Sequence, residues 1–384
     1  MKKSRTIETD VVHAGVSGKR VEGAVVMPVF QSSTYEYTGQ QSYEDLRYIR
    51  LNNTPAHRQL HRKLAALEQG EAALVTSSGM AAITATLLSL LSSGDHLLAQ
   101  DCLYGGTTSF LSGDLPALGI GVDFIDGQRP EQWEALLKPE TRAIYVESIT
   151  NPLVQVGELK SVVEFARRHQ LTAIIDNTFA SPVNFRPLEQ GFDLVVHSCT
   201  KYLNGHSDLV AGAVIGSAEL VEGVNHKSML LGGCLDPHAC FLLERGIKTL
   251  VLRVRHQNRS AEAIARFLAS RPEVAKVNHP LLNKKRPSDG TQELFAGFGG
   301  MLSFELHGDA AVADAFIRRL EIPIEAPSLG GVETLITRPA TTSHLGWTPE
   351  ERAAVGISDS LMRMSVGIEG TEDLIDDLDR ALKA

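Results

Sequence analysis

The sequence predicts an α/β fold in which a large, mostly parallel sheet is followed by a smaller C-terminal α/β domain. Between about residues 56 and 215, short apolar runs that end in polar or turn residues alternate with helical patterns, which is typical of a parallel sheet covered by helices. A second pattern of helices and strands begins after about residue 250. We therefore expect an arm over residues 1–55, a large domain over 56–247 and a small domain over 248–384.

Five apolar runs are the predicted strands of the large domain. They cover residues 71–78, 95–101, 141–148, 172–178 and 193–199. Between the third and fourth runs, Leu159, Val162, Val163 and Ala166 recur at the spacing of one helix face, and cations follow at 167–169. This segment is predicted to be an amphipathic crossover helix.

The small domain is predicted from a second set of patterns. We expect helices near 258–270 and 309–320, strands at 299–306 and 360–369, and a final helix from Thr371. The first 55 residues are polar and lack sustained periodicity, so they are expected to form an arm that packs on a neighbouring subunit.

The composition favours an enzyme that acts on a small molecule. The net charge is −9 and no run of basic residues is present, so the sequence gives no sign of a surface that binds nucleic acid or an anionic membrane. No run approaches the ~20 apolar residues of a membrane span, and the N-terminal stretch lacks the apolar core of a secretory signal. The four cysteines lack the close pairs of a zinc site, so we expect reduced thiols in a cytoplasmic protein.

Candidate site residues fall where predicted strands end, which is where open α/β sheets bind ligands. The turn at 77–80 places Ser78, Gly79 and Met80 at a predicted helix N-terminus, whose N–H groups and dipole favour a phosphate. The same residues also fit a plain strand-to-helix turn with a hydroxyl cap. The turn alone leaves both interpretations open.

Lys201 follows the last predicted strand of the large domain, among hydroxyl and thiol side chains. Burial would lower the pKa of such a lysine and free its amine to attack an aldehyde. An aldehyde cofactor with a phosphate is pyridoxal 5′-phosphate (PLP), which also needs a carboxylate near its ring nitrogen. Asp176 can supply that group from the end of the strand at 172–178. Taken singly, a strand-end aspartate is more often a cap and a loop lysine a solvated charge; the conjunction favours PLP.

A metal site is the weaker interpretation of the loop that follows Lys201. His206 and Asp208 offer two ligands without a third nearby. A structural polar loop is therefore expected there, and no metal.

Seven segments resemble, in order and approximate spacing, the Cys/Met-metabolism enzymes that use PLP: the cystathionine γ-synthases, cystathionine lyases and methionine γ-lyases. They are SSGMAAI, CLYGGT, ITNPL, DNTFASP, HSCTKYLNGHSD, SLGGVETL and LMRMSVGIE, and the resemblance covers essentially the whole chain. It implies the PLP-dependent transferase fold (fold type I, aspartate aminotransferase-like), which has an N-terminal arm, a large cofactor domain and a smaller C-terminal domain.

The resemblance implies a role for each matching residue of the cofactor site. Lys201 is the lysine that bonds the aldehyde and serves as general base, and Asp176 is the partner of the ring nitrogen. Tyr104 lies over the ring, and its hydroxyl is a candidate acceptor for a substrate proton. The remaining cofactor contacts, several of them to the phosphate, are Ser78, Gly79, Met80, Thr178, Ser198 and Thr200.

Two residues of the arm segment RYIRLNNTP are implied to act in the neighbouring subunit. Tyr48 and Arg50 match a Tyr-x-Arg motif that reaches the neighbour's phosphate, a task suited to the planar fork of arginine. Asn53, Thr54 and Pro55 then stand in place of the family's usual Asn-Pro-Thr. A homo-oligomer is implied, at least a dimer with shared active sites and usually a tetramer in this family.

The resemblance also implies a substrate site. Arg363 grips the α-carboxylate as a bidentate pair, with Ser328 and Asn151 assisting. Arg47, beside Tyr48, is a candidate to meet a distal carboxylate in the neighbouring active site. A solvated interface charge is an equally good interpretation of Arg47.

The implied reaction cleaves or exchanges a C–S or Cγ–O bond of a cystathionine- or homoserine-type amino acid. We expect a lyase that acts on cystathionine or a related thioether; the alternative is a cystathionine γ-synthase that joins an O-acylhomoserine and cysteine, and methionine γ-lyase ranks third. No subtype's markers are complete. Pro327 stands where many relatives have glutamate, about Ser109 where several have arginine, and Gly106 where methionine γ-lyases have cysteine; the aromatic pair of enterobacterial β-lyases is missing at Pro327 and Leu329.

Overall fold

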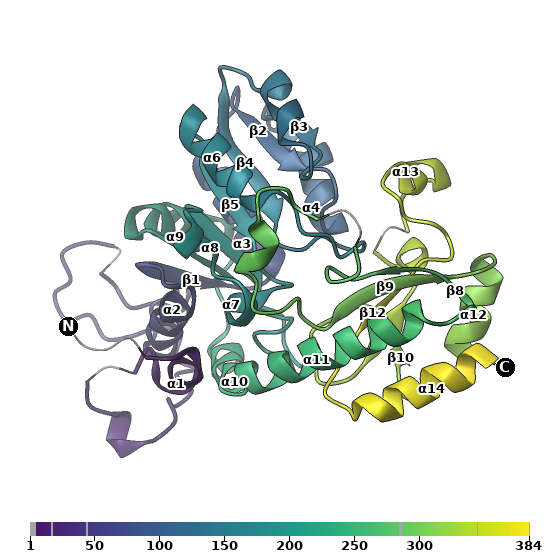
Figure 1. Ribbon diagram of the computed structural model, residues 1–384. Coiled ribbons are helices and arrows are strands. Elements are labelled where there is room, and N and C mark those ends of the chain that lie inside the picture. Colours follow the sequence, from purple (N-terminus) through teal and green to yellow (C-terminus); the bar gives the residue numbers. More distant parts are fainter. Residues whose placement is uncertain (1–4, 17, 44, 284–285, 344, 384) are drawn as a thin grey trace.

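The computed structural model describes residues 5–16, 18–43, 45–283, 286–343 and 345–383. Successive parts of the chain form a seven-stranded sheet and then a five-stranded sheet, each covered by helices (Figure 1). This arrangement agrees with the predicted α/β class, in which a large sheet precedes a smaller one.

The large sheet has the strand order β1-β7-β6-β5-β4-β2-β3, in which β7 runs antiparallel to both of its neighbours and the other pairs are parallel. Its strands are Ala72–Thr76 (β1), His96–Gln100 (β2), Gly121–Ile125 (β3), Thr141–Glu147 (β4), Thr172–Asp176 (β5), Leu194–Ser198 (β6) and Gly212–Gly216 (β7). The five predicted strands correspond to β1, β2, β4, β5 and β6. The sequence pattern misses β3, a half-exposed edge strand, and β7, which begins and ends with glycine.

Alternate residues of the large sheet face two apolar layers. Ile144 and Val146 of β4 face the layer formed with α2 (Pro55–Glu68), α6 (Leu159–His169) and α10 (Pro237–Ile247). Ala143 and Tyr145 face the layer formed with α3 (Gly79–Leu90) and α9 (Ala218–Leu231). Burial on both faces explains why these strands read as near-continuous apolar runs. The predicted crossover helix is α6.

The small sheet has the strand order β10-β11-β12-β9-β8. Its strands are Val274–Asn278 (β8), Met301–Leu306 (β9), Ile324–Glu325 (β10), Leu335–Thr337 (β11) and Met362–Ser365 (β12), and its covering helices are α11 (Leu250–Ala269), α12 (Ala310–Arg319) and α14 (Thr371–Lys383). We call each sheet with its covering helices a unit, the large unit and the small unit. Helix α11 extends from the large unit along the small sheet, beside α14 (Figure 1). It begins at Leu250, earlier than predicted, because its first turns pack in the core of the large unit and its later turns in that of the small one.

Shorter helices complete the fold at Gly105–Ser109 (α4), Leu115–Ala117 (α5), Ser181–Asn184 (α7), Pro187–Gln190 (α8) and Pro349–Ala354 (α13). None of the helices in the described ranges has the length and apolar character that a membrane crossing requires. All four cysteines are free thiols.

The arm begins with a part that packs on its own chain. Helix α1 (Ile7–His13) contacts α2 and α11, and Lys63 Nζ donates a hydrogen bond to the carbonyl of Val11 at 2.8 Å. After the arm, Thr54 caps α2 by accepting a hydrogen bond from the N–H of His57, with Pro55 in the first turn. The Asn-Thr-Pro order thus makes a favourable helix start. Contact between the arm and another subunit stays a prediction.

Candidate active site

One cavity of ≈ 700 Å³ lies at the carboxyl ends of β1, β4, β5 and β6, where they meet loops of the small unit. Every predicted site residue outside the arm lines this cavity. The predicted arm residues Arg47, Tyr48 and Arg50 are not among the described residues that line it. The structure therefore brings together residues from both sheets and leaves the arm residues apart.

The N-terminus of α3 forms a cradle on one side of the cavity. Ser78 caps this helix, because its Oγ accepts a hydrogen bond from the N–H of Ala81 at 3.0 Å. The N–H groups of Gly79 and Met80 belong to the first helical turn, where no intrahelical acceptor exists for them. A Cβ on Gly79 would lie 2.8 Å from the Cβ of Ser198, so glycine is what lets Ser198 approach the helix end. This arrangement suits an anion such as phosphate.

Two threonines hold the loops around this cradle. Thr178 Oγ1 accepts a hydrogen bond from the N–H of Ser198 at 2.8 Å. Thr200 Oγ1 donates to the carbonyl of Ala211 at 3.2 Å and accepts from the N–H of the same residue at 3.1 Å. Both hydroxyls therefore make contacts within the protein, and their direct contact with a phosphate stays a prediction.

The acidic side of the cavity has two carboxyl groups. Asp176 ends β5, Glu147 ends β4, and the two residues are register partners in adjacent parallel strands. The N–H of Thr178 donates to Asp176 Oδ1 at 2.9 Å, and the N–H of Tyr104 donates to Glu147 Oε1 at 2.7 Å. Burial raises the pKa of Asp176. Burial also raises the pKa of Glu147 well above its ordinary value, and the charge of Asp176 adds to that shift.

Sequence reasoning identified Asp176 and missed Glu147. Both residues are acids at the carboxyl end of a predicted strand, so the same signal was present in the segment VES at 146–148. The sequence does not show that β4 and β5 are neighbours, and only that pairing places the two carboxyl groups side by side.

Lys201 lies on the loop after β6, and its Nζ donates a hydrogen bond to Ser328 Oγ at 2.8 Å. Burial lowers the pKa of Lys201 to about 8, and the positive charge of Arg363 contributes to the same shift. The unprotonated amine therefore exists at a lower pH than in an exposed lysine. Such an amine is suited to attack an aldehyde.

Arg363 lies on β12 and is only 5% exposed. Its Nη1 donates to Asn151 Oδ1 at 3.0 Å, and its Nη2 donates to the carbonyl of Ser328 at 3.0 Å. Ser328 has a φ of +94°, a strained value for a residue with a side chain. Neutral acceptors thus hold the guanidinium at the cavity wall, which suits a binding site for a carboxylate.

The arm residues make their contacts elsewhere in the chain. Arg50 donates to the carbonyl of Met229 at 3.2 Å and to the hydroxyl of Tyr43 at 2.6 Å. Its guanidinium carbon also lies 5.6 Å from the ring centroid of Tyr48.

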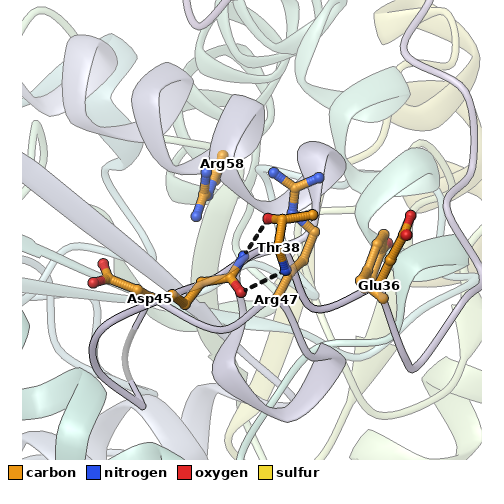
Figure 2. A pocket seen from close by; sticks show the side chains of 7 residues that line it. Glu36, Thr38, Asp45, Arg47 and Arg58 are labelled. Atoms are coloured by element: carbon orange, nitrogen blue, oxygen red, sulfur yellow. Dashed lines mark hydrogen bonds between the residues drawn. The ribbon is translucent and has the colours of Figure 1, made fainter.

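Arg47 lines a second cavity, of ≈ 340 Å³, formed mainly by the arm (Figure 2). Its guanidinium carbon lies 5.4 Å from the ring centroid of Tyr35, a cation–π geometry. Arg58 of α2 and the acids Glu36 and Asp45 line the same cavity. In its own chain Arg47 is thus placed among arm residues.

A loop of the small unit supplies lining residues that sequence reasoning did not find. Thr341, Thr342, Ser343 and Leu345 lie in the segment after β11 and line the active-site cavity. This segment carries no periodic pattern, and hydroxyl-rich loops are common.

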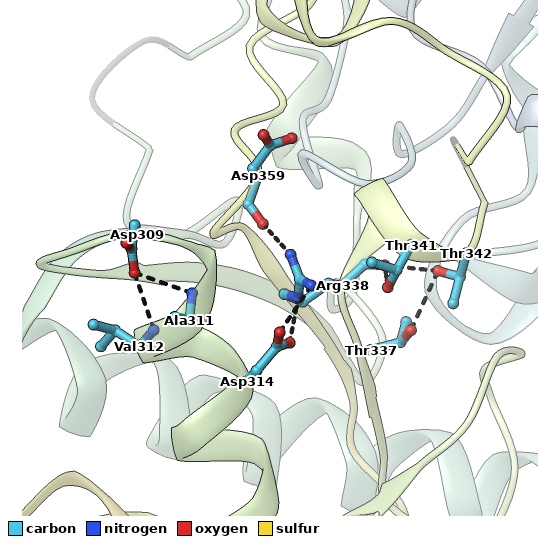
Figure 3. A network of polar contacts seen from close by, with 9 residues as sticks. All are labelled: Asp309, Ala311, Val312, Asp314, Thr337, Arg338, Thr341, Thr342 and Asp359. Carbon is cyan, nitrogen blue, oxygen red and sulfur yellow. Dashed lines mark hydrogen bonds and ion pairs between the residues drawn. The ribbon is translucent and has the colours of Figure 1, made fainter.

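Arg338 anchors that loop (Figure 3). Its Nε and Nη2 donate to the two carboxylate oxygens of Asp314 at 2.6 and 3.1 Å, a bidentate pair, and its Nη1 donates to the carbonyl of Asp359 at 2.6 Å. Because Arg338 precedes the loop and Asp359 follows it, one side chain ties both ends together.

Residues 8–383 match the family described as Cys/Met metabolism PLP-dependent enzyme. The chain belongs to this family. It is 41% identical over 379 residues to the cystathionine beta-lyase of Lactococcus lactis subsp. cremoris (98% of this chain, 99% of the relative). It is also 41% identical over 377 residues to the cystathionine gamma-lyase of Bacillus subtilis, with the same coverage. The cystathionine gamma synthase of Xanthomonas oryzae pv. oryzae, solved with aminoacrylate and cysteine, has a TM-score of 0.94 at 37% identity, covering 99% of this chain and 98% of that one.

These comparisons confirm the predicted family, the PLP-dependent transferase fold and an enzyme of Cys/Met metabolism that uses PLP and acts on a small molecule. The cavity fits this cofactor. The α3 cradle with Ser198 suits its phosphate, Lys201 suits its aldehyde, and Asp176 suits its ring nitrogen.

Proposed function

We propose that this enzyme is a carbon–sulfur lyase of transsulfuration that cleaves cystathionine or a related thioether amino acid. The main observation behind the proposal is that Lys201 and Arg363 both donate hydrogen bonds to Ser328, at the wall of one cavity. That geometry offers a base and a carboxylate anchor to one α-amino acid. The 41% identity to a cystathionine beta-lyase and to a cystathionine gamma-lyase supports cystathionine as the substrate.

The chain's own residues account for substrate binding and proton transfer. When bound, PLP would supply the electron sink that weakens the bonds at the substrate's Cα. Arg363 holds the α-carboxylate, and Asn151 and Ser328 hold its guanidinium in place. Lys201 Nζ removes the Cα proton, and the Tyr104 hydroxyl, on a 46% exposed side chain at the cavity, is a second group able to accept one.

The site residues have proposed roles toward the cofactor as well. Asp176 carries the negative charge opposite the ring nitrogen, and Ser78, Gly79, Met80, Thr178, Ser198 and Thr200 surround the phosphate. Tyr48 and Arg50 act on the phosphate of a neighbouring subunit, and Arg47 meets the distal carboxylate of its substrate. The described lining of their own chain's cavity does not include these arm residues, which supports this assignment.

Shared active sites require at least a dimer, and we propose a tetramer built from two such dimers. Leu230 and Leu231, which follow the Met229 carbonyl bound by Arg50, are 69% and 56% exposed. Exposed leucines next to the arm support an interface there. The four free cysteines support a reducing compartment, for which we propose the cytoplasm.

γ-Replacement by a cystathionine γ-synthase is the second candidate. The TM-score of 0.94 to a solved cystathionine gamma synthase favours it. Elimination and replacement use the same base and carboxylate anchor, so the cavity geometry described above is compatible with both.

The deciding experiment measures the keto acid that the purified, PLP-loaded protein releases from L-cystathionine. Pyruvate shows β-elimination and 2-oxobutanoate shows γ-elimination, and either supports the lyase. The same preparation is given O-succinylhomoserine and cysteine. If cystathionine is inert but accumulates in that second reaction, the enzyme is a γ-synthase and the lyase proposal is wrong.

A further inference from the structure

Glu147 takes no part in the proposed reaction, yet it is a deeply buried group of the cavity wall, only 5% exposed. It pairs with Asp176 across β4 and β5, and paired residues of neighbouring strands lie about 4.8 Å apart. The two side chains also share a face of the sheet. Tyr145 and Ile174, each two residues earlier in its strand, both lie in the apolar layer against α3.

Two carboxyl groups this close in a buried site cannot both be ionised at little cost. The surroundings favour the anion on Asp176. Its Oδ1 accepts the Thr178 N–H at 2.9 Å, and the hydrogen bonds from Thr178 lower its pKa against the effect of burial. Of the two carboxyl groups, Asp176 therefore has the stronger stabilisation of its negative charge.

The surroundings of Glu147 favour a neutral acid. Its Oε1 accepts the Tyr104 N–H at 2.7 Å, whereas its Oε2 is buried without a hydrogen-bond partner among the described residues. The backbone N–H groups of Tyr104 and Asn151 lower the pKa of Glu147, but burial outweighs them, because a full negative charge is costly in a buried site. Burial and the charge of Asp176 both raise the pKa of Glu147, which favours its protonated form. The titratable groups that act on or contact Glu147 include Cys102, Tyr104, Tyr145 and Asp176, and His197 acts on Asp176.

We propose that Glu147 is a positioning residue that works as a neutral carboxylic acid: it fixes the backbone of Tyr104 at the cavity and leaves Asp176 as the single anion for the ring nitrogen. This inference rests on the proposed roles of Tyr104 and Asp176. It adds a residue that acts through both of them without touching substrate.

Infrared difference spectroscopy tests the protonation state directly. At neutral pH, the PLP-loaded protein is expected to show the carbonyl stretch of a protonated carboxylic acid, and Glu147→Gln is expected to lose it. Glu164→Gln, on the exposed side of α6, is the matched control and should keep the band. A band that survives in Glu147→Gln, or that never appears, overturns the inference. Should Glu147→Gln fail to fold, wild-type protein labelled with 13C-glutamate gives the same answer, because the label shifts the band of a protonated glutamate but not that of an aspartate.

A second readout follows the absorption of bound PLP against pH. If Glu147 is already neutral, Glu147→Gln removes no charge. The proton affinity that the midpoint of the titration measures should then change by less than about twofold. A shift of tenfold or more would show that Glu147 is ionised. Glu147→Leu removes the acceptor of the Tyr104 N–H and is expected to raise the PLP dissociation constant about tenfold; an unchanged constant would refute the positioning role. These readouts need no turnover. If they give the expected results but the protein releases no keto acid, the proposed reaction is wrong and the inference about Glu147 stands.

Discussion

Lys201 Nζ lies 2.8 Å from Ser328 Oγ, although Lys201 follows a strand of the large sheet and Ser328 precedes a strand of the small sheet. The carbonyl of the same serine accepts a hydrogen bond from Arg363. One strained residue therefore connects the proposed base to the proposed carboxylate anchor. The packing of the two units, through the shared helix α11, sets how far apart these groups lie.

The lowered pKa of Lys201 predicts how the apoprotein takes up PLP. The protonated amine is not nucleophilic, so the rate of bond formation to the aldehyde should rise about tenfold per pH unit below about pH 8 and then level off. The absorbance change on mixing apoprotein with PLP measures it. A model lysine amide, whose pKa is about 10.4, is the control and should keep gaining rate above pH 8. An apoprotein rate that also rises toward pH 10 would contradict the assignment.

Replacement of Arg363 by lysine should impair substrate binding severely. Lysine keeps the positive charge but loses the planar fork, and the acceptors Asn151 and Ser328 are positioned for that fork. We expect kcat/KM to fall about 100-fold, equivalent to about 3 kcal/mol. Arg266→Lys, on the exposed face of α11, is the matched control. Equal values of kcat/KM for both variants would contradict the role of Arg363 in substrate binding.

Gly79→Ala should weaken PLP binding. The new Cβ would meet Ser198 at 2.8 Å and push it from the helix end. Loss of about 1–3 kcal/mol, or about 5- to 150-fold in the PLP dissociation constant, is expected from such overpacking. The control is Gly113→Ala, where a Cβ meets nothing within 4 Å. Fluorescence titration of both apoproteins with PLP distinguishes them, and equal affinities would place the phosphate elsewhere.

Arg47→Ala should raise KM for cystathionine much more than KM for a neutral thioether, since only cystathionine carries a distal carboxylate. A roughly tenfold loss of preference for cystathionine over the neutral thioether corresponds to about 1.4 kcal/mol for one charged contact. Arg58→Ala removes another arginine of the same arm cavity (Figure 2) and serves as the control. Equal effects of Arg47→Ala on the two substrates would leave Arg47 as an interface charge.

Local patterns and motifs were sufficient for the fold class and for most of the candidate site. The apolar runs of β1, β2, β4, β5 and β6 are continuous because both faces of the sheet are covered, so they stand out in the sequence. Asp176 and Lys201 are recognisable because Asp176 ends one such run and Lys201 lies just after another, at the sheet edge where ligands bind. The edge strand β3 and the glycine-bounded β7 lack that signal.

Tertiary structure alone decided the relationships between groups that are far apart in the chain. Glu147 and Asp176 form a pair only because β4 and β5 are neighbours in the sheet, and Ser328 reaches Lys201 only because the two units pack together. The loop with Thr341 and Thr342 enters the cavity wall in the same way. A sequence pattern records the local periodicity of burial, whereas the pKa of a buried group depends on the neighbours that the fold brings to it.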